Sequence, residues 1–268
     1  MNKIGWELRS EFVRLRCLID SKKLCLLGFG FCSLLCLLRK SGSTLIAFGH
    51  GVFGEDIGFY WNMIDAANPS GSLARSGFAG TSLFIPLIIV FVIWQEYDYR
   101  AGTILSCARG RNRFGNGLAH LMSVALFSTL CYALLCCMSL AVASARGGHA
   151  ITLDVLASFM GALGLNCILV ISVALEALAL YRMTQSGLFA GAALTVGFFA
   201  SLVVYGCNFT TNLALVKWVF LLPGPYLGAG CALGFKTMNE LSLVIYGGTV
   251  AAVSAFLYGV HGYLFRRY

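Results

Sequence analysis

Six apolar runs dominate the sequence, and each approaches the roughly 20 residues that a helix needs to cross the hydrocarbon core of a bilayer. They lie at about 18–38, 78–95, 117–145, 153–180, 187–206 and 242–264. Charged residues make up 11% of the chain, whereas soluble domains usually carry about 25%, so little polar surface is left to face water. The runs therefore predict an all-α integral membrane protein with six transmembrane helices, built as a single domain over residues 1–268.

The positions of lysine and arginine predict the orientation of these spans. With the N-terminus inside the cell, thirteen of the nineteen basic residues fall on the cytoplasmic side and six on the outer side, as the positive-inside rule requires. Both termini are then cytoplasmic, in a multi-pass protein of the cell membrane. The same bias explains the net charge of +8, and because no basic stripe with interleaved aromatic residues occurs, nucleic acid is not an expected partner.

The chain before the first span has the pattern of an amphipathic helix over about residues 3–20. Ile4, Leu8 and Phe12 share one face of this helix, and Lys3 and Arg14 fall towards the other side. A basic amphipathic helix beside a span is typical of a segment that lies in the membrane interface. We therefore expect membrane lipid to contact this helix.

The segment at 207–241, on the outer side, contains an apolar stretch of about ten residues, which is too short to cross the bilayer. We expect this stretch to re-enter the membrane or to lie at its surface. Cys207 and Cys231 both belong to the segment and are the pair most suited to a disulfide. Two free thiols explain the sequence equally well.

Residues suited to catalysis or to metal binding are sparse. The four histidines are scattered without metal-ligand spacing, and neither a nucleophile elbow nor a phosphate-binding loop is present, so no metal or bound cofactor is expected. Apart from Asp20 and Asp154 at the starts of their runs, Glu176 is the one acid inside an apolar run, and an intramembrane carboxylate is a candidate functional group. It lies only ~6 Å along a helix from the polar boundary, which favours a structural or interfacial role.

A polar interruption separates the second apolar run from the third. Residues 95–114, QEYDYRAGTILSCARGRNRF, have acids near their start and arginines near their end, which suits the two ends of a helix. We expect a short cytoplasmic coupling helix over about 96–113, with a basic face that can dock on another protein. A loop that only holds the topology would explain the arginines, but not Glu96 or the pair Gly102-Thr103.

This interruption resembles the permease subunits of type-2 ATP-binding-cassette (ABC) exporters. The pattern is an apolar span that ends in Glu96-Tyr97, then Gly102-Thr103-Ile104, then Gly110 to Arg113. The amphipathic start, the six-span layout and the outer segment before the last span are similar as well. The resemblance implies that a separate ATPase subunit docks on the coupling helix through Glu96, Gly102, Thr103, Arg109 and Arg113.

The same resemblance implies what the chain does. Two permeases, identical or related, would pair with two ATPase subunits and form a path for a hydrophobic or amphipathic cargo, such as a drug, a peptide antibiotic or a lipid. ATP and Mg²⁺ would bind to the ATPase, so this chain would not itself be an enzyme. Permeases without fused ATPase domains are more typical of bacteria within this family.

Two other functions stay open. An intramembrane hydrolase or transferase would use Glu176 or the outer group formed by His50, Glu55 and Asp56, although the topology places His50 and Glu176 on opposite sides of the bilayer. A passive pore or an assembly factor would work without any ATPase partner.

Overall fold

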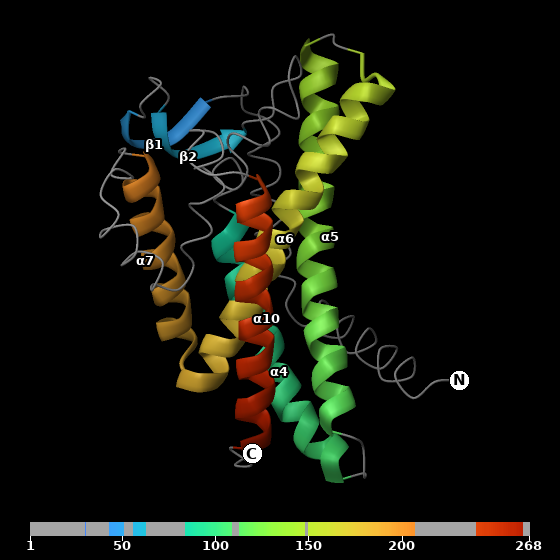
Figure 1. Ribbon diagram of the computed structural model, residues 1–268, viewed down its shortest axis with the longest axis vertical. Coiled ribbons are helices and arrows are strands. Elements are labelled where there is room, and N and C mark those ends of the chain that lie inside the picture. Colours follow the sequence, from blue (N-terminus) through green and yellow to red (C-terminus); the bar gives the residue numbers. More distant parts are fainter. Residues whose placement is uncertain are drawn as a thin grey trace.

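Helices form the body of the protein in the computed structural model, which describes residues 30, 43–50, 56–62, 84–108, 113–147, 150–206 and 240–264 (Figure 1). The described helices are α4 (Phe84–Ala108), α5 (Arg113–Gly147), α6 (Leu153–Thr184), α7 (Gly187–Gly206) and α10 (Glu240–Leu264). The amphipathic helix expected at 3–20 lies outside the described residues. So do all but one residue of the run at 18–38 and all but the last two residues of the segment at 207–241, including Cys207 and Cys231.

The last four apolar runs are helical as predicted, and they correspond to α5, α6, α7 and α10. The second run, 78–95, differs because its helix does not end at the polar interruption. α4 continues through Glu96 to Ala108, so residues 96–108 belong to the same helix as the span. This stretch contains no proline, and its single glycine, Gly102, is tolerated in a helix interior at a cost of about 1 kcal/mol.

Two of the described helices are long and apolar enough to cross a membrane. The apolar windows are Gly115–Val142 within α5 and Leu153–Thr184, which is the whole of α6. In the most apolar 18-residue stretch of each helix, 33% of the residues of α5 are buried, against 61% of those of α6. In Figure 1 the end of α5 and the start of α6 project beyond the ends of α7 and α10. The full set of six spans stays a prediction.

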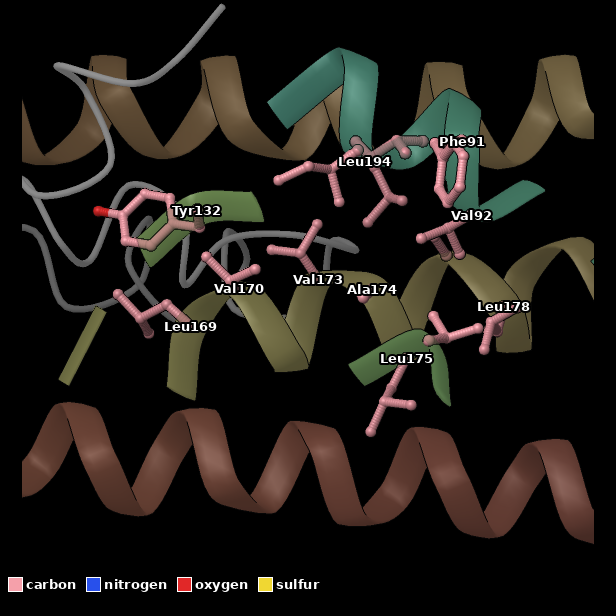
Figure 2. Close-up of a cluster of buried hydrophobic side chains, with 14 of the residues drawn as sticks. Phe91, Val92, Tyr132, Leu169, Val170, Val173, Ala174, Leu175, Leu178 and Leu194 are labelled. Atoms are coloured by element: carbon pink, nitrogen blue, oxygen red, sulfur yellow. The ribbon is translucent and has the colours of Figure 1, made fainter. Parts of the chain in front are cut away.

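The hydrophobic core is built around α6, which contacts each of the other four described helices. Figure 2 shows Leu169, Val173 and Leu178 of α6 in this core, together with Phe91 of α4 and Leu194 of α7. Since lipid tails are as apolar as these side chains, helices in a membrane associate through close packing and interhelical hydrogen bonds. α6 provides such contacts on several sides.

A hydrogen bond joins α6 to α10 at a point where a glycine lets the two helices approach closely. The hydroxyl of Ser172 donates to the carbonyl oxygen of Gly247 at 2.6 Å and also lies 2.8 Å from the carbonyl oxygen of Ile168. A Cβ atom at Gly247 would lie 3.3 Å from Cδ2 of Leu169, which is tighter than ordinary contact. Gly247 therefore lets the two backbones approach closely enough for the hydrogen bond.

A small two-stranded antiparallel sheet accompanies the helices of this largely α-helical protein. Strand β1 (Ser43–His50) pairs with β2 (Asp56–Asn62), and the last residue of β1, His50, is paired with the first of β2, Asp56. Both strands mix β-branched or aromatic residues with small polar ones, a composition that favours strands. Such short strands escape detection because apolar length alone identifies the spans.

Candidate functional site

Glu96 is a fully buried carboxylate in the interior of α4. Its Oε1 atom lies 3.0 Å from Nε of Arg100 and 3.6 Å from Nη1 of Arg182. Its Oε2 atom lies 3.0 Å from Nε2 of His120 and accepts a 2.8 Å hydrogen bond from the hydroxyl of Tyr258. These five residues, which we call the Glu96 cluster, come from four helices: α4, α5, α6 and α10.

The charges of the Glu96 cluster explain how a carboxylate can be buried there. An ionised group inside a protein is unfavourable unless it is paired and hydrogen-bonded, and each oxygen of Glu96 has two partners. The arginines keep part of their side chains exposed, 23% for Arg100 and 19% for Arg182. The cluster has two arginines against one carboxylate. Because both arginines are partly exposed, their excess positive charge is solvated at the edge of the bundle.

Aromatic rings enclose the cluster. Tyr99 stacks on His120 with ring centroids 4.0 Å apart and an angle of 14° between the planes. The guanidinium of Arg182 lies 4.3 Å from the ring centroid of Tyr258, and that of Arg100 lies 5.1 Å from the ring centroid of Tyr181. Both distances fall within the range of cation–π attraction. The rings thus hold the charged groups in place and limit the access of water to Glu96.

The C-terminal end of α6 joins the cluster through Gln185. This residue has a φ of 57°, in the left-handed region, and its backbone N–H caps the helix by donating to the carbonyl oxygen of Tyr181 at 2.8 Å. Its side-chain oxygen accepts a hydrogen bond from Nη1 of Arg100, and its Nε2 donates to the carbonyl oxygen of Arg182 at 2.5 Å. A residue other than glycine is strained in this conformation by roughly 1–2 kcal/mol, and these hydrogen bonds offset that strain.

The residues expected to contact an ATPase lie at different places along α4 and α5 where the structure describes them. Glu96 lies inside the bundle, where its carboxylate contacts residues of its own chain. Gly102 and Thr103 lie in the second half of α4, and Arg113 is the first residue of α5. Arg109 lies outside the described residues.

The residues considered for catalysis lie on different elements. Glu176 is half-buried in α6, and Arg182, farther along the same helix, contacts Glu96. His50 and Asp56 face each other in the register of the β1–β2 sheet, and Glu55 is not among the described residues. Within the part of the chain whose side chains are described, no group of three or more His, Cys, Asp or Glu residues is placed to hold a metal ion.

Reasoning from the sequence does not find most of the Glu96 cluster. One available signal is that His120 lies within the third apolar run, because an ionisable residue inside a membrane segment is a functional candidate by default. A carboxylate, an imidazole and a phenol together could move a proton, but Glu96 and His120 are fully buried and Tyr258 nearly so. The cluster is therefore best suited to joining four helices through one buried carboxylate. No protein-family model, curated protein or solved structure matches the chain.

Proposed function

We propose that this chain is the membrane-spanning permease subunit of a type-2 ABC exporter. It forms part of the path for a hydrophobic or amphipathic cargo, such as a drug, a peptide antibiotic or a lipid. ATP is hydrolysed by a separate ATPase subunit, and a second permease, identical or related, completes the path. The protein belongs in the cell membrane, with six spans and cytoplasmic termini.

The observation that carries this proposal is the position of Glu96. It is the first residue of the segment that resembles a coupling helix, and it is fastened to His120 in α5, Arg182 in α6 and Tyr258 in α10. A displacement of the polar segment that follows Glu96 would be transmitted to these three helices through the contacts of one buried carboxylate. Such a connection is what a permease needs to convert a movement of its partner into a rearrangement of its spans.

The exposed face of α5, on the side away from the core of the bundle, supports a location in the bilayer. Large apolar side chains recur every four residues along this helix and are exposed: Leu118, Met122, Leu126, Leu130, Leu134 and Met138. In a water-soluble protein the apolar stripe of a helix faces the core and the polar residues face outward. A helix with the reverse arrangement is suited to contact with lipid.

The experiment that tests the proposal is purification of the tagged protein from its native membrane, with identification of co-purifying proteins by mass spectrometry. Arg113→Glu reverses a charge of the coupling segment at the first residue of α5, and Arg146→Glu makes the same reversal near the other end of that helix. We expect a phosphate-loop ATPase with the wild type and with Arg146→Glu, and its loss from Arg113→Glu. Cysteine-accessibility mapping should show the same topology in all three proteins.

Two results would contradict the proposal. If no ATPase accompanies the wild type under conditions that preserve membrane complexes, the chain is not a permease of this class. If the ATPase stays bound to Arg113→Glu, docking does not occur at this end of α5. Substitutions at Glu96 are unsuited to this test because they disturb four helices at once, and loss of transport would not report on docking.

A further inference from the structure

The buried face of α5 carries polar side chains along most of its length. They are Asn116, His120, Ser123, Ser128, Tyr132, Ser139 and Ser144. Where a helix faces lipid on its other side, such groups must find hydrogen-bond partners inside the bundle, because hydrocarbon offers none. Each buried polar atom of α5 should therefore have a hydrogen-bond partner within the bundle.

Three buried side-chain oxygens, one in α4 and two in α5, have no hydrogen-bond partner in the part of the chain that the structure describes. They are Oε1 of Gln95 in α4 and the hydroxyl oxygens of Ser123 and Ser128 in α5. The side chains are 3%, 1% and 2% exposed, so bulk solvent does not reach them. Leaving a buried polar group without a partner costs about 1–3 kcal/mol, and native proteins rarely accept this cost.

The register of α4 against α5 places the residues of two of these atoms, Gln95 and Ser123, at the same level. Tyr99 stacks on His120, and Phe91 stacks on Phe127 with ring centroids 4.5 Å apart. Gln95 lies one turn from both Phe91 and Tyr99 on α4, since residues four apart share a helix face. Ser123 likewise lies three residues from His120 and four from Phe127 on α5, so the register brings Gln95 and Ser123 to the same level of the two helices, between the ring stacks.

The chemistry of the pair defines what fits between them. The Gln95 oxygen only accepts hydrogen bonds, whereas the Ser123 hydroxyl both donates and accepts. A small molecule that donates one hydrogen bond to Gln95 and exchanges another with Ser123 would satisfy both atoms. Water meets this requirement, and buried waters typically make about three hydrogen bonds to polar groups that would otherwise have none.

We propose that Gln95 and Ser123 hold an ordered water molecule between α4 and α5. The site lies one turn from Tyr99 and His120, so it extends the polar contacts of the Glu96 cluster into the apolar bundle. The water links two helices that otherwise meet through stacked rings at this level. This inference concerns the isolated chain and does not depend on the exporter proposal.

The test is a double-mutant cycle on the full chain in detergent, with the melting temperature as the readout. If a shared water satisfies both atoms, Gln95→Leu and Ser123→Ala each lower the melting temperature, because each leaves the other atom without its partner. The double variant should then melt no lower than the single variants, since it leaves neither buried atom without a partner. Gln95→Leu combined with Ser128→Ala is the matched control, because Ser128 is equally buried but points about 140° around α5 from Ser123. Its effects should be additive.

Radiolytic footprinting provides a second readout that a purely structural role would not move. Hydroxyl radicals formed from a bound water oxidise neighbouring side chains, so Phe91, Phe127 and Tyr99 should be labelled in the wild type and much less in the Gln95→Leu, Ser123→Ala double variant. The proposal is overturned if the two substitutions raise the melting temperature or act additively, because the atoms are then dry or separately satisfied. Absence of labelling on the flanking rings in the wild type would overturn it as well.

Discussion

The hydroxyl of Tyr258 donates a 2.8 Å hydrogen bond to Oε2 of Glu96, across 162 positions of the sequence. The ring of the same tyrosine lies beneath the guanidinium of Arg182, 4.3 Å from its centroid. Tyr258 therefore connects α10 to both α4 and α6 through two different interactions. A change in the charge or position of Glu96 therefore directly alters a hydrogen bond made by α10.

Tyr258→Phe isolates the hydrogen bond from the ring contact, because phenylalanine keeps the ring under Arg182 but removes the hydroxyl. A hydrogen bond to a charged group contributes about 1.5–3 kcal/mol, so we expect a clearly lower melting temperature in detergent. Tyr97→Phe removes a hydroxyl from an exposed side chain of α4 and should change little. Equal melting temperatures for the two variants would show that the Tyr258 hydroxyl does not stabilise the bundle.

Glu96→Gln tests the carboxylate itself. The neutral amide keeps the shape of the side chain but leaves Arg100 and Arg182 without their negative partner, and breaking a buried ion pair typically costs ~3–5 kcal/mol. We expect the lower part of this range because both arginines are partly exposed. The unfolding free energy of Glu96→Gln, Arg182→Gln and the double variant measures this coupling. The double variant should be more stable than the sum of the two single losses predicts, and strict additivity would argue against an ion pair between these residues.

Two substitutions at Gln185 separate the effect of backbone strain on stability from the effect of the side-chain hydrogen bonds. Gln185→Ala keeps a Cβ in the left-handed conformation and removes the contacts with Arg100 and Arg182, so it should be destabilising. Gln185→Gly removes the same contacts but relieves roughly 1 kcal/mol of strain. We therefore expect the melting temperatures to fall in the order wild type, Gly, Ala. If Ala is as stable as Gly, the left-handed cap does not carry strain in solution.

The sequence predicts the helices of this bundle better than it predicts their contacts. Apolar length identifies α5, α6, α7 and α10 because each must present hydrophobic residues over many turns. The end of α4 is not predicted, since backbone hydrogen bonds can continue from Ile93 through Glu96 regardless of side-chain polarity. The partners of Glu96 are not predicted either, because they depend on how α5, α6 and α10 are rotated about their axes. No local pattern connects Glu96 to Tyr258.

The adjacent glycines of α10 offer the sharpest test of the packing between α6 and α10. A Cβ at Gly247 would lie 3.3 Å from Cδ2 of Leu169 and 3.4 Å from Oγ of Ser172, whereas a Cβ at Gly248 would meet no atom within 4 Å. Gly247→Ala should therefore push the helices apart and weaken the hydrogen bond from Ser172, at a cost of about 1–3 kcal/mol. Gly248→Ala should be neutral or stabilising by up to ~1 kcal/mol, because alanine favours the helix. Thermal unfolding of both variants in one detergent measures the difference. If they behave alike, α10 does not pack on α6 through Gly247, and the close contact that brings Tyr258 to Glu96 loses its support.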